Sequence, residues 1–308
     1  MESECGSRDF GTSLQFLSVN PVEAECMMIE KAVSGVGTDE KVLASIVCGR
    51  SNKDLELLKV RRQKKDEFVI WWNVTNLSKI LSIQKKYFDL YSKDLGQLVA
   101  SELGGNMEKL IINVMQADEE EFDPGYHNQE KMEEDAVKLY KMGQGEIGSD
   151  EVGLFKIMVR SPPQYLHKLN MFYADKYGYT LPKVLENELG GELEFCAEFM
   201  LNMKLKPFEA IAEMVNDACE GFGTHELLLT VRFHEVWSFA LNLLFLTFFL
   251  VRPCLQKTLL IRYEPIMKKV DQAHQELYGK SIEERVQSET GGDHRAILKE
   301  VVATGMSM

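Results

Sequence analysis

The stretch at residues 34–51, SGVGTDEKVLASIVCGRS, decides the fold of this chain because versions of it occur three times. The second is GEIGSDEVGLFKIMVRSP at residues 145–162, and the third is EGFGTHELLLT at residues 220–230. Glycine commonly ends a helix, and a Ser/Thr-Asp-Glu run opens one, since its oxygens cap the first turn and its charges suit the positive helix end. Each copy therefore predicts a short helix, a glycine loop and a second helix.

A second motif, E-x-G-G, also occurs three times, with its acid at Glu102, Glu188 and Glu289. Apolar residues on both sides of each diglycine recur every three or four positions, as in LGQLVASELGGNMEKLIINVM. No segment shows a convincing alternation of polar and apolar residues, so the pattern predicts helices and no strands.

The spacing between the two motifs reveals a repeat of one length. From the Ser or Thr after the glycines to the acid, the distance is 39 residues in the middle copy, 64 in the first and 65 in the third. Removing residues 60–84 from the first copy and 231–256 from the third restores 39 in both. We interpret these two segments as inserts in an otherwise regular internal repeat.

The repeats resemble those of the annexin family, which have five short helices, GxGTDE between the first two and an acid before the last. The stretch QADEEEFDPGYHNQEKMEED resembles the linker between the family's second and third repeats. The resemblance implies an all-α fold, an annexin-like array of five-helix repeats forming a curved disc. It assigns the complete copies to the second, third and fourth repeats.

The expected organisation follows from this alignment. We expect a remnant of the first repeat at residues 1–19, repeats at 20–116 (insert 60–84), 131–203 and 204–308 (insert 231–256), and a linker at 117–130. Glu4 lies in phase with the later acids and would be the acid of the first repeat. An ordinary unstructured N-terminus is the alternative.

Glycine loops and a distant acid suit calcium. A Gly-x-Gly turn exposes backbone carbonyls, and Ca2+ takes six to eight oxygen ligands, including bidentate carboxylates. The ligands that the resemblance implies are Val33, Gly35, Gly37 and Glu102 in the first copy, Gly143, Glu146, Gly148 and Glu188 in the middle copy, and Cys219, Gly221, Gly223 and Glu289 in the last. The middle copy departs from the pattern because Glu146 replaces a glycine. Alternatively, each loop is only a turn between helices, and each Glu is a helix cap.

One carboxylate per site predicts weak calcium binding, with a dissociation constant of about 10⁻⁴ to 10⁻³ M and coordination positions left open. A lipid phosphate can fill one of them, so the ion would bridge the protein to anionic phospholipid membranes. Such a bridge is needed because 48 acidic against 35 basic residues give a net charge of −13, which also disfavours nucleic-acid binding. We expect self-association on membranes to be compatible with this function. The alternative is a calcium-independent helical scaffold, structural or cytoskeletal, whose lipid sites have decayed.

The sequence favours a cytoplasmic protein that becomes peripheral on membranes when calcium is raised. Its six cysteines form no CxxC pair and no apolar signal peptide follows Met1, which indicates reduced thiols. We expect no enzyme activity and no small-molecule substrate. The glycine loops lack the third glycine of a dinucleotide fingerprint and the GK[ST] of a P-loop, and the six histidines show no HExxH spacing. His225 replaces the Asp of GTDE, with no function assigned.

The two inserts differ in character from the repeats. Both begin Val-Arg and end in Gln before Lys, and their codons can carry intron boundary signals. Our leading hypothesis is that both are unspliced introns translated in frame, so that the excised product is the better-folded protein. The rivals are a basic phosphate-binding loop in the first insert, and in the second a membrane hook that presents Phe239, Phe245, Phe248 and Phe249. The sixteen apolar-rich residues 236–251 are too few to span a bilayer.

Overall fold

The computed structural model describes residues 8–19, 21–34, 37–48, 79–116, 118–144, 151–220, 225, 227–231, 233 and 266–307. These residues form α-helices, turns and connecting segments, with no strand among them, so the all-α prediction is confirmed. The chain divides into two compact units. We call residues 29–206 the middle unit and residues 1–28 with 207–308 the terminal unit.

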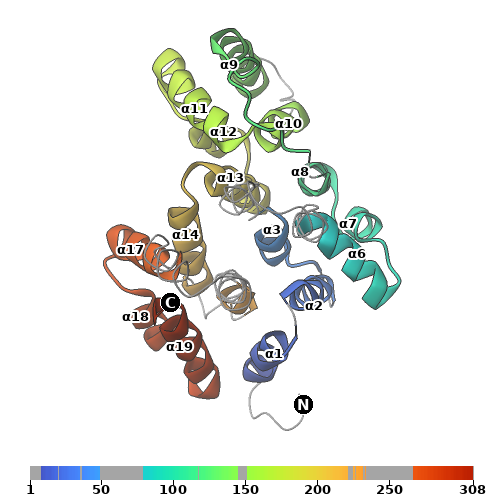
Figure 1. The fold of residues 1–308 in the computed structure, drawn as a ribbon, viewed down its shortest axis with the longest axis vertical. Coiled ribbons are helices and arrows are strands. Elements are labelled where there is room, and N and C mark those ends of the chain that lie inside the picture. The colour runs from blue at the N-terminus through green and yellow to red at the C-terminus, as the bar shows by residue number, and fades with distance from the viewer. Residues whose placement is uncertain are drawn as a thin grey trace, which may run out of the picture. The chain divides into compact units, whose positions relative to one another are not determined.

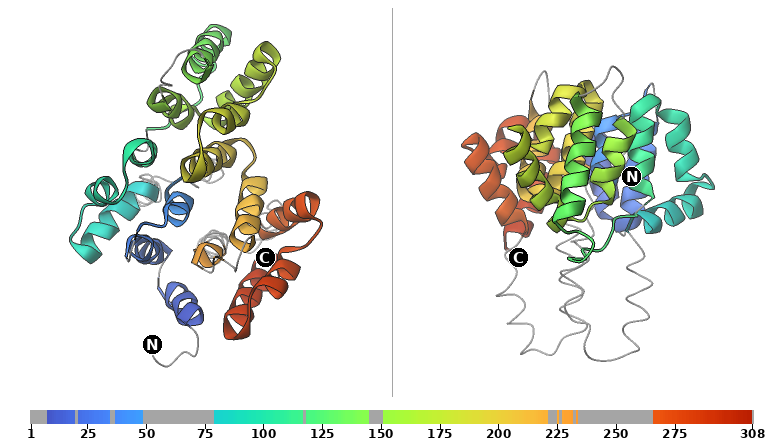
Figure 2. Two further views of the ribbon diagram at one scale, coloured as in Figure 1. Left: turned by 180° about the vertical axis from the view of Figure 1, so that it is seen from behind. Right: turned by 90° about the horizontal axis from the view of Figure 1, so that it is seen from above.

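Among the residues that the structure describes, the middle unit contains the end of α2 and nine further helices. Their bounds are α2 Pro21–Val33, α3 Glu40–Cys48, α6 Lys79–Tyr91, α7 Leu95–Glu102, α8 Gly105–Met115, α9 Gln129–Gln144, α10 Glu151–Arg160, α11 Pro163–Tyr177, α12 Leu181–Glu188 and α13 Gly191–Leu205. Helix α3 lies at the centre of this unit, against α8 and α13, and seven consecutive residues from Val42 to Cys48 are buried. Helices α9 and α11 lie side by side (Figure 2). Stacking of short helices therefore provides the core.

In the described part of the terminal unit lie the beginning of α2, five helices with bounds, and the helical residues 227–231 and 233. These are α1 Arg8–Leu17, α14 Pro207–Cys219, α17 Ile266–Tyr278, α18 Ile282–Glu289 and α19 Gly292–Ser307. Helix α14 packs along α17 (Figure 1), and α1 packs on α19. Helix α1 falls within the range expected for the first-repeat remnant, whereas Glu4 lies outside the described residues.

The three E-x-G-G motifs adopt one local structure. Helices α7, α12 and α18 each have eight residues and end at the motif's acid. The second glycine of each motif then opens the next helix with a positive φ of 60°, 62° or 53°. A left-handed conformation favours glycine because a Cβ would be strained there. The motif therefore places an acid at the end of one helix directly before a tight turn.

Residues at the edges of both predicted inserts are packed within helices. Helix α6 runs without a break across the end of the first insert, and Ile83 and Tyr87, one turn apart, are 2% and 0% exposed. The Nε2 group of Gln84 donates to the carbonyl of Met115 at 3.1 Å. At the start of the second insert, Val231 and Phe233 are helical and 0% and 1% exposed. The remaining insert residues, 60–78, 232 and 234–256, lie outside the described part of the chain.

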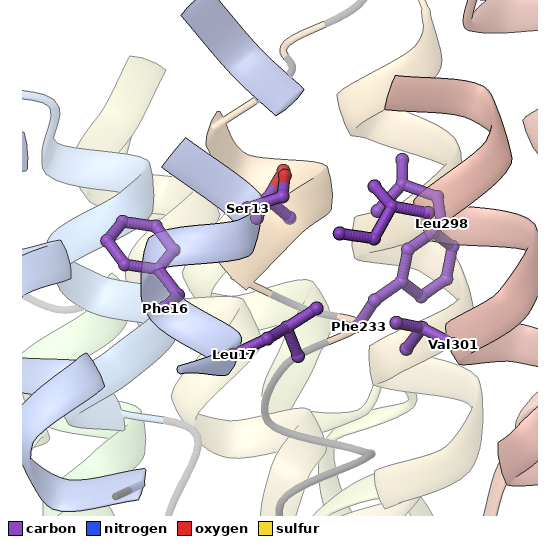
Figure 3. A pocket seen from close by; sticks show the side chains of 8 residues that line it. Ser13, Phe16, Leu17, Phe233, Leu298 and Val301 are labelled. Atoms are coloured by element: carbon purple, nitrogen blue, oxygen red, sulfur yellow. The ribbon is translucent and has the colours of Figure 1, made fainter. Parts of the chain in front are cut away.

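Phe233 contributes to a small apolar pocket within the terminal unit. Figure 3 shows Phe233 beside Leu298 and Val301 of α19, with Leu17 of α1 on the opposite side. At the pocket, the hydroxyls of Ser13 and Thr230 lie 3.3 Å apart. One residue of the predicted insert thus shares an apolar pocket with residues of α1 and α19 and with Thr230.

The described helices and cysteines relate to two predictions, one about membrane spanning and one about the state of the thiols. Among the described helices, none combines the length and the apolarity needed to cross a bilayer. The four cysteines in the described residues, Cys26, Cys48, Cys196 and Cys219, are buried thiols that form no disulfide with one another. Burial raises the pKa of the Cys196 thiol, which therefore stays protonated and unreactive.

Candidate functional site

The first elements of the candidate site are three helix ends that precede the glycine loops. Helix α2 ends at Val33, α9 at Gln144 and α14 at Cys219. The last carbonyls of a helix have no partner within that helix and are available to a ligand. Each of these residues stands five positions before the Ser or Thr of its loop.

The alignment of helix ends also suggests a neighbour of one predicted ligand. In the middle copy the sequence analysis names Gly143, but the position equivalent to Val33 and Cys219 is Gln144. Gly143 is buried in the last turn of α9, where an added Cβ would lie 2.8 Å from Cγ1 of Val184 and 3.8 Å from Cγ of Glu188. The glycine therefore allows α9 to approach α12 closely, and Gln144 is the better candidate for the carbonyl.

The loops of the second and fourth repeats close with the same backbone bonds. The N–H of Asp39 donates to the carbonyl of Ala32 at 2.8 Å, and the N–H of His225 donates to the carbonyl of Ala218 at 2.7 Å. Each pair is seven residues apart and encloses the glycine turn. The helix ends and the start of the next helix are thus held together in both repeats.

In the second and fourth repeats the helix that follows the loop is capped by a side chain. Asp39 Oδ1 accepts from the N–H of Val42 at 3.1 Å, and His225 Nδ1 accepts from the N–H of Leu228 at 3.2 Å. The His225 ring, which sequence reasoning left without a function, takes the capping place of the aspartate. The signal for this role was its position in GTHE, directly before the helix.

In the second repeat the loop and the distant acid meet. The Thr38 hydroxyl donates to Oε2 of Glu102 at 3.3 Å and lies 3.5 Å from the Glu102 carbonyl oxygen. Gly37, next to Thr38, has a φ of 89° and open space where a side chain would be. The structure therefore brings together Val33, Gly37 and Glu102 at one end of the repeat, while Gly35 lies outside the described residues. Sequence reasoning did not name Thr38 as the link.

In the third repeat, only part of the candidate site is described. Glu188 ends α12 beside the last turn of α9, near Gly143. Glu146 and Gly148 lie outside the described residues. The contact between α9 and α12 therefore places the acid close to the beginning of the loop.

In the fourth repeat the acid has different neighbours. Oε1 of Glu289 lies 3.9 Å from Nη1 of Arg285 and 3.2 Å from the hydroxyl of Ser288. A second nitrogen of Arg285 donates to Oδ1 of Asn216, whose Nδ2 donates to Glu220 at 2.6 Å. Cys219 ends α14 next to Glu220, whereas Gly221 and Gly223 lie outside the described residues. This network joins the beginning of the loop to the acid.

The oxygen atoms at the candidate site suit a hard cation that can be held with a single protein carboxylate. Among the described residues, no group of three or more His, Cys, Asp or Glu side chains could hold a metal ion. Helix-end carbonyls, an open glycine turn and one carboxylate remain, which are oxygen ligands of the kind calcium accepts. Within the same described part of the chain, no Lys, Arg or His nitrogen lies within ion-pair distance of Glu102. The second repeat therefore offers an anionic oxygen pair next to the loop.

Comparisons with known proteins agree over nearly the whole chain. Annexin A13 of Mus musculus is 24% identical over 298 residues, covering 97% of this chain and 77% of that protein. The structure of chicken annexin V matches with a TM-score of 0.72 at 19% identity, covering 98% of this chain and 78% of that one. Calcium-bound annexin (Sm)1 matches with a TM-score of 0.68 at 20% identity, covering 98% and 74%. No family model matches the chain.

The matched proteins and the observed helices support the same assignment. The relatives are annexins along almost all of the chain, and the folds that match are annexin folds. The repeated loop, eight-residue helix and diglycine turn occur in three copies in this chain. The chain is thus similar to annexins along nearly its whole length, and its helices have the annexin fold.

Proposed function

We propose that the protein is a calcium-dependent phospholipid-binding protein of membrane surfaces. The observation that carries the proposal is the 3.3 Å hydrogen bond from Thr38 to Glu102, which joins a glycine loop to an acid 64 residues away. The calcium-bound state of annexin (Sm)1, a protein of the same fold, supports calcium as the ion. The carbonyl and carboxylate oxygens at this place match the ligand preference of calcium.

Residues of the second repeat would hold the ion. The carbonyls of Val33, Gly35 and Gly37 would supply neutral oxygens, and Glu102 would supply the anionic bidentate ligand. Gln144, Glu146, Gly148 and Glu188 would serve in the third repeat, and Cys219, Gly221, Gly223 and Glu289 in the fourth. Since each site has few protein ligands, a lipid phosphate completes the coordination, and the ion offsets the repulsion between an acidic protein and an anionic membrane.

Liposome co-sedimentation tests this function. Full-length protein is mixed with phosphatidylserine-containing vesicles, or with pure phosphatidylcholine vesicles, in millimolar calcium or in chelator. We expect pelleting with the anionic vesicles only in calcium. Pelleting that is equal in calcium and in chelator would contradict the proposal and favour the calcium-independent scaffold.

A triple variant, Glu102→Gln, Glu188→Gln and Glu289→Gln, tests the ligands. Glutamine keeps the size of each side chain and removes its charge, so helicity should stay unchanged while the calcium requirement rises at least about tenfold. A calcium dependence identical to that of the parent protein would contradict the assignment of the three acids.

A further inference from the structure

The three candidate acids differ in the residue that stands one helical turn before them. Four positions before the acid lie Leu98 in α7, Val184 in α12 and Arg285 in α18. Residues four apart on a helix are neighbours on its surface. The fourth repeat is therefore the only copy of the three in which a cation stands at this position.

Arg285 is held in place by partners on two helices. Its side chain is 12% exposed, and it binds Asn216 of α14 while one of its nitrogens lies 3.9 Å from Oε1 of Glu289. Asn216 in turn binds Glu220 at the start of the glycine loop. The guanidinium thus lies beside Glu289, is linked through Asn216 to Glu220, and is not free to swing into solvent.

A bidentate ligand must present both of its oxygens to calcium. In Glu289, Oε1 is approached by the Arg285 guanidinium and by the Ser288 hydroxyl. Calcium would have to compete with both of these groups for Oε1, and the fixed positive charge would repel the ion. In Glu102, by contrast, the recorded side-chain partner is the uncharged hydroxyl of Thr38.

A second arginine increases the positive charge at this turn. Arg295 Nε donates to the carbonyl of Thr290 at 2.6 Å, directly after Glu289. The equivalent positions, six residues after the acid, hold Glu108 in the second repeat and Glu194 in the third. Both differences lower the negative potential of the fourth-repeat site relative to the other two.

We propose that Arg285 acts as a built-in counter-ion that attenuates calcium binding at the fourth repeat, so that the sites with Glu102 and Glu188 fill first. This inference rests on the proposed calcium-dependent function and assigns a regulatory residue to one of its sites. The fourth repeat would then engage the membrane only at higher calcium concentrations than the other two.

The test is a reciprocal exchange of the two residues in the full chain. Arg285→Leu places in the fourth repeat the leucine that the second repeat has four residues before its acid. Leu98→Arg places in the second repeat the arginine that the fourth repeat has there. Calcium binding is measured without lipid, by equilibrium dialysis and by the calcium-induced rise in melting temperature. Met171→Arg, at a side chain that is 72% exposed on α11, controls for the added charge.

We expect Arg285→Leu to tighten one class of sites about tenfold and Leu98→Arg to weaken another about tenfold, with Met171→Arg unchanged. Wild-type affinities in both exchange variants would overturn the inference and leave the proposed function standing. A parent protein that binds no calcium would overturn both. If Arg285→Leu fails to melt cooperatively because Asn216 has lost its partner, the Leu98→Arg result decides, since Leu98 is only partly buried.

Discussion

The second and fourth repeats close their glycine loops alike but differ around the acid. The backbone bonds from Asp39 to Ala32 and from His225 to Ala218 are nearly equal in length, although one cap is a carboxylate and the other an imidazole. Glu102 meets the Thr38 hydroxyl, whereas Glu289 lies beside Arg285. The loop therefore keeps the same closing bond with either capping residue. The electrostatic potential at the acid depends instead on the residue one helical turn before it, which lies outside the loop motif.

The two repeats also incorporate their inserts at different helices. In the second repeat the end of the predicted insert supplies the first six residues of α6, and in the fourth the first residue of the predicted insert, Val231, continues the helical residues 227–230. In both places an apolar residue of the predicted insert is buried, namely Ile83 and Phe233. The periodic apolar face decides which residues fill the core, whatever their origin.

The largest effect that tests this comparison is expected from truncating the buried insert residues. Phe233→Ala should cost about 3–5 kcal/mol and Ile83→Ala about 2–5 kcal/mol of unfolding free energy, because each leaves a cavity in a packed core. Chemical denaturation of the full chain measures both. Phe88→Ala, at a side chain that is 57% exposed in α6, is the matched control and should stay within about 0.5 kcal/mol. Equal stability of Phe233→Ala and the parent would show that this residue is not part of the core.

The sequence alone was sufficient to predict the fold but only part of the site. Helices, glycine turns and the acids at helix ends follow from residue spacing, because apolar periodicity and positive-φ glycines act locally. The contact of Arg285 with Asn216 joins residues 69 positions apart and depends on the packing of α14 against α18. No local pattern reports such a contact, and the same holds for the meeting of α9 and α12 at Gly143.

The insert junctions show a different limit of sequence reasoning. Counting residues from motif to motif locates the inserts, but several neighbouring excisions restore the same spacing. The structure shows that Ile83 and Phe233 satisfy the apolar pattern of the helices they join. Periodicity therefore cannot distinguish insert residues from repeat residues near a junction.

Excision of both inserts is expected to have the second largest effect. Removing residues 60–84 and 231–256 brings Leu58 to the place of Ile83 and Leu259 to the place of Phe233, which preserves both apolar positions. Shortening two connections also lowers the entropy cost of closing them. We expect the excised protein to melt a few degrees higher, at about 3 °C for each kcal/mol, and to bind anionic vesicles at lower calcium.

One residue replacement that results from the excision is expected to destabilise the protein, and reversing it provides an internal control. Lys257 would take the place of Val231, a residue that is 0% exposed. Adding Lys257→Val to the excised protein should therefore raise its melting temperature further, because the buried charge is removed. A full chain that melts as high as both excised forms, together with a mature transcript that encodes both inserts, would contradict the intron hypothesis.

A smaller effect is expected when the acids of the two repeats are neutralised one at a time. Glu102→Gln should raise the calcium concentration for half-maximal vesicle binding about tenfold, because it removes the anionic ligand of a site without a competing cation. Glu289→Gln should change it by about twofold or less, because Arg285 already offsets that charge. Co-sedimentation across a calcium titration measures both midpoints. Equal shifts in the two variants would mean that the two repeats contribute alike.

The smallest effect is expected from exchanging the helix-capping residue, which differs between the two loops. His225→Asp gives the fourth repeat the cap of the second, and an aspartate accepts from Leu228 while its charge suits the positive end of the helix. We expect a gain of about 0.5–1 kcal/mol in unfolding free energy, with the calcium midpoint unchanged, because the cap fixes the helix start and leaves Arg285 beside Glu289. The reverse exchange, Asp39→His, should cost a similar amount. A large change in the calcium midpoint for His225→Asp would show that the cap, and not the arginine, sets the difference between the two sites.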